Sequence, residues 1–267
     1  MTELLQLNFR RRIQALLWGR RLLWAAGIVA VLFWRTGWAL FATIAIGIVL
    51  GGALKAWEMS SRRQFVREAS FPRFLGAKLR ATYPQLQERD TDLVLRGLRQ
   101  FFMAHLRSDR KFVAMPSKLV DAAWHEFILH TQGYQRWCAA AFGGLLHHTP
   151  AEVLGRDARR NDGLRRTWYW TCKEESIDPR SPTRLPLLFA LDAKFGVEGG
   201  FRYVPDCKDI DAQGASGTHC GSSFGDSGDG SSGDAGGFGG SDSSGGDSGG
   251  GGDGGSGCGG GCGGGGD

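Results

Sequence analysis

Residues 22–34 read LLWAAGIVAVLFW and residues 37–54 read GWALFATIAIGIVLGGAL, so that only Arg35 and Thr36 separate two uncharged runs. The second run has the length of a membrane-spanning helix, and the first reaches that length when it is extended back to Ala15. One helix through both runs would be too long for a bilayer and would place Arg35 near its centre, at a cost of about 3 kcal/mol. The sequence therefore predicts a helical hairpin with spans over residues 15–34 and 37–55.

The residues that flank the two runs agree with this hairpin. Tryptophans gather near the predicted span ends, as in an aromatic belt, and positive charges flank both outer ends. The residues expected to face lipid headgroups are Arg20, Arg21, Lys55, Arg62 and Arg63. The positive-inside rule then predicts that both ends lie in the cytosol, with the hairpin in a bacterial inner membrane. A hairpin buried in a soluble core is the alternative, and a cleaved signal peptide fits poorly because the apolar stretch begins late.

Charge and glycine are unevenly distributed along the 267 residues. The net charge is +5, yet the last basic residue is Lys208 and only acidic charges follow it. Residues 211–267 consist mainly of Gly, Ser and Asp, a composition without the apolar mass that ordering requires. We expect a disordered tail that acts as a spacer, and the CGGGC segment of Cys258 and Cys262 does not change this interpretation. A basic body next to a membrane favours anionic lipid as a partner over nucleic acid.

The segment between hairpin and tail has helical periodicity. Apolar residues recur at helical spacing over 90–106, and Ser117 is a plausible N-cap of a helix that should run to about Ala141 and stop at Gly143–Gly144. Further helices are expected over residues 58–71, 71–83, 164–177 and 185–195. No segment alternates with period two for long enough to predict a sheet. We therefore expect an all-α fold in three parts: residues 1–57 with the hairpin, a helical cytosolic domain over 58–210, and the tail.

One stretch, VDAAWHEFILHTQGYQRWCAAAFGGLLHHTP over residues 120–150, resembles the glycine-rich domain-containing protein-like family. The resemblance covers residues 115–150 well and the rest of the helical domain loosely, and the glycine-rich C-terminus is consistent with it. Glu126 and Phe127 depart from plant members of that family. The resemblance implies a fold, and little mechanism, for a bacterial membrane-anchored member. The matched residues are Asp121, Trp124, His125, Tyr134, Cys138, His147 and His148.

These residue types allow two interpretations. Asp121 and His125 are four apart on a predicted helix and share a face, and a carboxylate that holds an imidazole is common beside a metal-bound histidine. His125, Cys138, His147 and His148 would form a nitrogen and sulfur site of the kind that zinc prefers. The favoured interpretation is instead a structural clasp between Asp121 and His125, supported by Trp124 and Tyr134. HEFILH is not the H-E-x-x-H motif, so a zincin is excluded.

The function expected from the sequence is a membrane-tethered helical interaction or scaffold module with an unknown protein partner. The alternative is a zinc-dependent enzyme or metal-binding protein that uses His125, Cys138 and the His147–His148 pair. No motif identifies a catalytic residue, since nothing supplies an oxyanion hole or a third member for a Cys–His dyad.

Overall fold

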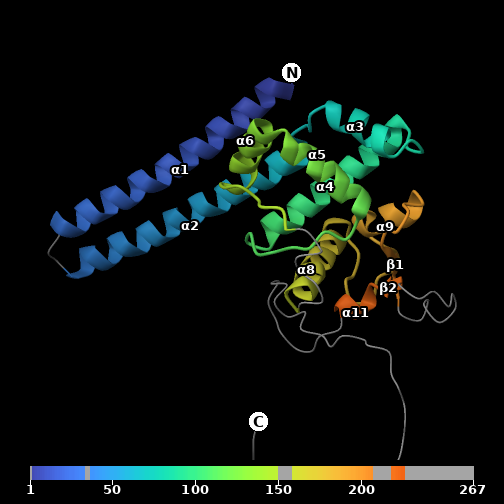
Figure 1. Ribbon diagram of the computed structural model, residues 1–267. Helices are drawn as coiled ribbons and strands as arrows, with labels where there is room; N and C mark the ends of the chain where they lie inside the picture. Colours follow the sequence, from blue (N-terminus) through green and yellow to red (C-terminus); the bar gives the residue numbers. More distant parts are fainter. Residues whose placement is uncertain (1, 34–36, 150–157, 207–217, 226–267) are drawn as a thin grey trace, which may run out of the picture.

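The computed structural model describes residues 2–33, 37–149, 158–206 and 218–225, and its elements are almost all helical (Figure 1). Two long helices, α1 (Thr2–Phe33) and α2 (Gly37–Glu68), run antiparallel and project from a body of shorter helices. The remaining elements are α3 (Phe74–Thr82), α4 (Glu88–Arg107), α5 (Lys118–Leu129), α6 (Thr131–Phe142), α8 (Ala158–Glu174), α9 (Leu187–Lys194), β1 (Arg202–Val204), β2 (Thr218–Cys220) and α11 (Ser222–Gly225). The predicted all-α class is confirmed.

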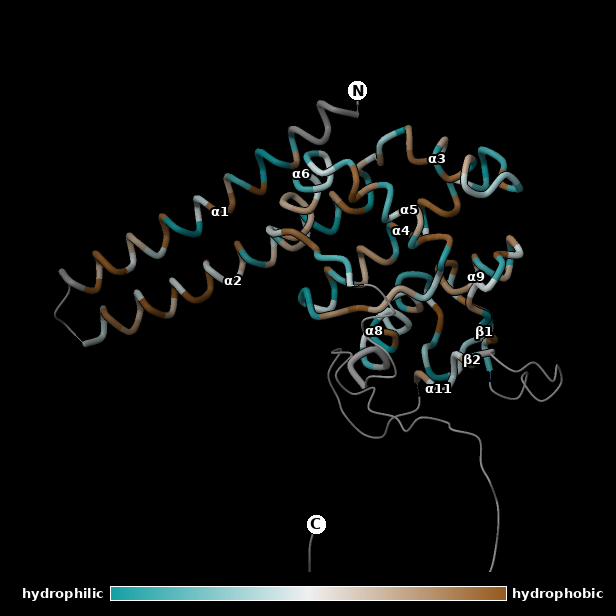
Figure 2. The backbone as a smooth tube through the Cα atoms, viewed as in Figure 1, coloured by the Kyte–Doolittle hydropathy of each residue, from teal (hydrophilic) through white to brown (hydrophobic). Residues whose placement is uncertain are grey.

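The hairpin has two halves of opposite character (Figure 2). Its outer half is apolar and exposed, with 88 % of Trp38 and 70 % of Phe41 accessible to solvent. Among the described residues, one helical segment, Leu40–Glu68 of α2, is long and apolar enough to cross a membrane, with a mean hydropathy of 1.8 over its best window. The span predicted over α1 stays a prediction. That α2 continues beyond the apolar run to Glu68 agrees with the expected helix over residues 58–71.

The inner half of the hairpin belongs to the core of the body. Phe9 of α1 packs edge-on against Phe65 of α2, with ring centroids 6.2 Å apart, and Phe65 lies 5.7 Å from Trp137 of α6. Both phenylalanines and Trp137 are buried. The boundary predicted at residues 57 and 58 falls inside the continuous helix α2, so the hairpin and the body are joined without a linker.

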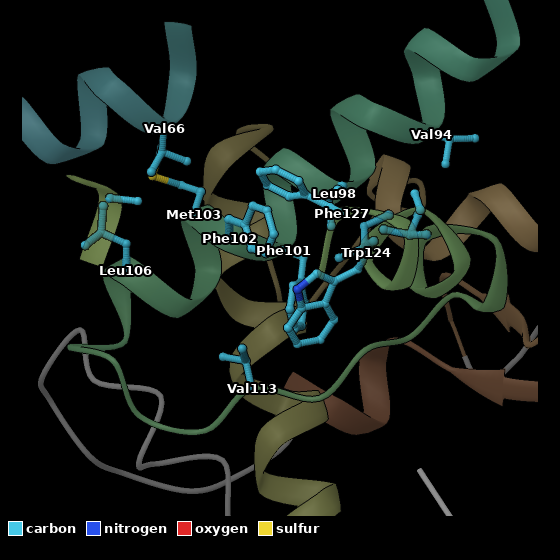
Figure 3. Close-up of a cluster of buried hydrophobic side chains, with 14 of the residues drawn as sticks. Val66, Val94, Leu98, Phe101, Phe102, Met103, Leu106, Val113, Trp124 and Phe127 are labelled. Carbon is cyan, nitrogen blue, oxygen red and sulfur yellow. The ribbon is translucent and has the colours of Figure 1, made fainter. Parts of the chain in front are cut away.

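Helix α4 lies at the centre of the body and contacts α2, α3, α5, α8 and α9. Its buried face carries aromatic and aliphatic side chains that meet Val66 of α2 and Trp124 of α5 (Figure 3). Gly97 lets α5 and α9 approach this helix closely, because a Cβ there would lie 2.5 Å from Leu191 and 3.1 Å from Val120.

Three features differ from the sequence predictions. The helix expected from Ser117 to Ala141 is two helices, because the backbone of His130 leaves the helical region at ψ 60° and its ring occupies the space that a Gly133 side chain would need. Ser117 does cap α5, and Gly143 ends α6 in the left-handed region at φ 81°. A small parallel sheet pairs β1 with β2, where no strand was expected.

The third difference lies in the predicted tail. Residues 218–225 form β2 and α11, and the Phe224 ring lies 5.8 Å from Trp168 of α8, so an isolated aromatic residue gives this segment a place to pack. Cys220 is disulfide-bonded, whereas Cys138 and Cys172 are free and buried. The prediction of disorder for residues 226–267 lies outside the described residues.

Candidate metal centre and adjoining pocket

Helix α5 sets two of the candidate ligands on one face, four residues apart. His125 Nδ1 lies 3.3 Å from Asp121 Oδ2 and 2.9 Å from the Asp121 carbonyl oxygen. The other carboxylate oxygen, Asp121 Oδ1, lies 2.9 Å from His148 Nε2. The carboxylate thus contacts both imidazoles, as the i, i+4 spacing on α5 predicts for the first of them.

His148 reaches this helix because the chain after α6 is tied back to α5. The Tyr134 hydroxyl donates to the carbonyl of Leu146 at 2.5 Å, and Trp124 Nε1 donates to the Tyr134 oxygen at 3.1 Å. The His148 ring then packs edge-on against Trp124, with centroids 4.6 Å apart. Burial raises the pKa of Tyr134, so this hydroxyl keeps its proton and its role as a donor.

The three side chains offer a set of metal ligands. One ligand atom from each of Asp121, His125 and His148 lies within 4.8 Å of the others, and the two rings are 4.3 Å apart. Two imidazole nitrogens and one carboxylate oxygen form a donor set that zinc accepts, and three protein ligands leave a fourth position open. The side chains of His148, Asp121 and His125 are 14 %, 30 % and 53 % exposed, so an ion can enter from solvent.

A cavity of about 360 Å³ adjoins these residues. Half of its lining residues are apolar, among them Phe101, Phe112, Trp124 and Phe201, and half are polar, among them Asp121, His125 and His148. A cavity that combines aromatic walls with convergent polar groups is a usual form of small-molecule site.

His105 lines the same cavity and is a polar residue that sequence reasoning missed. It is 7 % exposed, its Nδ1 lies 3.2 Å from the Lys111 carbonyl, and Phe142 packs edge-on against its ring. Burial lowers its pKa to about 4, so the imidazole is neutral at neutral pH. His105 lies among the buried apolar positions of α4, far in sequence from the other histidines, so no motif in the sequence points to it.

The structure brings together only part of the predicted ligand set. His125 and His148 converge, and Asp121 joins them as a third candidate ligand, where the sequence predicted an outer partner. His147 is exposed and lines the cavity without joining the cluster. Cys138 is fully buried beside the Tyr134 hydroxyl, and burial raises the pKa of its thiol, so its assignment as a ligand is corrected. The clasp between Asp121 and His125 exists, but it lies at the surface.

The predicted lipid-facing cations also divide into two groups. Arg21, Lys55 and Arg63 are exposed. Arg62 is only 2 % exposed and donates to Glu58 and to the carbonyls of Ala139 and Ala140 at the end of α6, so it does not face lipid. Arg20 is half-buried and pairs with Glu58 at 3.0 Å. Arg20 and Arg62 therefore share the buried carboxylate of Glu58, a pairing that the sequence alone does not reveal.

Asp192 of α9 is a further residue that sequence reasoning missed. It is 2 % exposed and accepts hydrogen bonds from the hydroxyl of Ser117 and from the backbone N–H groups of Lys118, Leu119 and Phe201. A carboxylate at a helix N-terminus is favourable, and this one fixes the start of α5, one turn before Asp121.

A family model matches residues 61–224, described as UCP032817-like. The chain belongs to the UCP032817-like family. The match begins in α2 and ends at Phe224, so it covers the whole body and the candidate metal centre but leaves out the apolar half of the hairpin. No curated protein and no solved structure gives a significant match. The description of the family names no activity, so membership assigns none to this chain.

Proposed function

We propose that the chain is a membrane-tethered helical module, in which the α1–α2 hairpin is the anchor and the body works at the membrane surface. The supporting observation is the division of the hairpin: its outer half exposes large apolar side chains, while its inner half is buried in the core. Isolated exposed apolar residues are ordinary, but a continuous apolar surface over two long helices marks a membrane or partner contact.

The proposal also states on which side of the membrane the body lies and which partners it has. The exposed cations Arg21, Lys55 and Arg63 lie where the apolar half of the hairpin gives way to the body. By the positive-inside rule they favour a cytosolic body at a bacterial inner membrane. The bilayer is the first partner, and a second protein partner is expected for an interaction or scaffold module. The resemblance to the glycine-rich domain-containing protein-like family belongs to this proposal, and it rests on the motif around Trp124 and His125.

Alkaline carbonate extraction tests the anchor, because it releases surface proteins and leaves inserted helices in place. The full chain, expressed in bacterial membranes, should resist extraction. The double variant Ile46→Glu/Val49→Glu should be released, since each carboxylate within a span costs about 2.5–3.5 kcal/mol. Leu129→Glu/Leu145→Glu alters two exposed apolar residues of the body and should behave as wild type. Release of the wild-type chain would refute the anchor.

A second function is favoured by the convergence of Asp121, His125 and His148: we propose that the module binds a zinc-class divalent ion there. The two histidines are 23 residues apart in sequence, yet they meet on one carboxylate that lines the cavity. A bound ion would carry an open coordination position, as catalytic rather than structural zinc sites do. A metal-dependent enzyme remains the alternative to the scaffold on this basis.

Elemental analysis of the full chain, purified in detergent without a histidine tag, tests the metal centre. We expect close to one zinc per chain, a lower melting temperature after chelation, and loss of the metal in His125→Ala and His148→Ala. His130→Ala removes an exposed histidine outside the cluster, and Cys138→Ser alters the buried thiol; both should keep the metal. A metal-free wild type that also takes up no added zinc would refute the centre.

A further inference from the structure

A deep groove lies where the hairpin meets the body. Its volume is about 1090 Å³, and its walls come from α1, α2, the end of α6 and the turn after α4. Seven cationic residues line it against two acidic ones, Glu58 and Asp109. The cations are Arg10, Arg20, Arg21, Lys55, Arg62, Arg110 and Arg136.

Most of this positive charge is uncompensated. Arg20 and Arg62 share Glu58. Within the described ranges, the other five cations make no ion pair, and the Nε of Arg10 is buried without a hydrogen-bond partner. An arginine nitrogen that is removed from water and left unpaired is costly, so an anion in the groove would supply what the protein does not.

The lining of the groove also changes along its length, from cationic side chains near the body to apolar side chains near the apolar half of the hairpin. Arg20 of α1 pairs with Glu58 of α2, and the uncharged runs of the two helices end nearby, at Arg21 and at Lys55. On the body side lie Arg10, Arg110 and Arg136. On the other side, the wall is formed by Trp24, about one helical turn beyond Arg20, and by Ile48, about two turns from Lys55. The order of chemistry along the groove is therefore cationic and then apolar.

We propose that this groove binds an anionic phospholipid, with its phosphate among Arg20, Arg110 and Arg136 and an acyl chain along Trp24 and Ile48. The proposal rests on the membrane anchor proposed above. A soluble phosphate compound would use only the cationic part, and an acidic peptide would leave the Trp24 wall without a partner. A phospholipid matches both parts in the order in which a bilayer presents them.

Native mass spectrometry of the full chain from nanodiscs with equal phosphatidylglycerol and phosphatidylcholine tests the groove. The wild type should retain phosphatidylglycerol in preference to phosphatidylcholine. Arg110→Ala/Arg136→Ala should lower that preference by about twenty- to thirty-fold, because each cation near an anionic lipid surface contributes about five-fold. Arg89→Ala/Arg96→Ala removes the same charge from exposed positions of α4 outside the groove and should leave the preference unchanged.

Three results would overturn the proposal. Equal retention of both lipids by the wild type would do so, and it is also the result expected if an acidic polypeptide occupies the groove. An equal loss in the control variant would show a general effect of net charge. Displacement of the lipid by an excess of glycerol phosphate would show that the acyl half is not used. Insertion of the same chain into pure phosphatidylcholine nanodiscs tests the anchor separately. A chain that inserts there but shows no preference for phosphatidylglycerol in the mixed nanodiscs refutes the lipid groove and leaves the anchor standing.

Discussion

At the scale of single residues, buried polar groups decide where the candidate site lies. Asp192 accepts hydrogen bonds from three donors at the start of α5 and from the N–H of Phe201, and Tyr134 holds the segment that carries His148. Neither residue is a candidate ligand. They fix the two elements whose side chains must meet, which is the role that outer residues have around metal sites.

Replacing Asp192 should therefore destabilise the body. Asp192→Ala leaves the Ser117 hydroxyl and buried N–H groups of α5 unpaired, and we expect the free energy of unfolding to fall by about 3 kcal/mol. Urea unfolding of the full chain in detergent, followed by Trp fluorescence, measures this. Asp92→Ala changes an exposed carboxylate of α4 and should stay within about 0.5 kcal/mol of wild type. Equal effects of the two changes would contradict the assigned role.

The buried His105 predicts a specific pH dependence. Its pKa is lowered to about 4 in the folded state against 6.5 in the unfolded chain, so below pH 6.5 the unfolded chain binds the extra proton. Stability is therefore present above that pH and is lost as pH falls, by about 2 kcal/mol between pH 7 and pH 5. In His105→Gln, the fall in the free energy of unfolding between pH 7 and pH 5 should be smaller by about 2 kcal/mol. Unfolding curves at both pH values measure this difference. Identical pH slopes would mean that His105 is not buried as a neutral group.

Some residue assignments follow from sequence and others do not. The spacing of Asp121 and His125 predicts their contact. Tyr134, Trp137, Cys138 and Ala141 follow the i, i+3, i+4, i+7 pattern of a buried helix face, so the burial of Cys138 was predictable from the period of α6. The choice between His147 and His148 was not, because it depends on a loop whose path is fixed by the hydrogen bond from Tyr134.

At the scale of elements, the junction between α2 and α6 fixes the body to the hairpin. Arg62 extends from α2 to the carbonyls of Ala139 and Ala140, where α6 ends, and Glu58 holds its guanidinium at 2.9 Å. A cation at the C-terminus of a helix meets both the unpaired carbonyls and the negative end of the dipole. Long-range pairs of this kind are not visible in sequence, whereas the helices they join are.

Breaking this junction should cost more than losing a surface charge. Arg62→Met leaves Glu58 buried with only Arg20 as its partner, and we expect a loss of about 3 kcal/mol. The double variant Glu58→Gln/Arg62→Met should cost less than the sum of the single changes, because the buried charge is removed together with its partner. Thermal unfolding in detergent, with the exposed neighbour Arg63→Met as the control, measures these differences. Additive effects would contradict the coupling.

At the scale of the whole molecule, a helical body is continuous with an apolar hairpin that it does not cover. Composition and the two uncharged runs were enough to predict this arrangement. The break at His130 and the packing of Phe224 on Trp168 were not predictable, because each depends on contacts between segments far apart in the chain. If the hairpin is inserted as proposed, the candidate site near Asp121 is held at a fixed distance from the membrane surface.

Two-sided labelling of a single added cysteine tests this account most directly. In Gly37→Cys the probe lies at the outer end of the hairpin, while the native Cys258 and Cys262 lie in the tail. In intact cells, we expect an impermeant maleimide to label position 37 and not the tail. In inverted vesicles we expect the reverse, as read by mass spectrometry of proteolytic fragments. Labelling of position 37 and the tail from the same side would contradict the membrane-inserted hairpin.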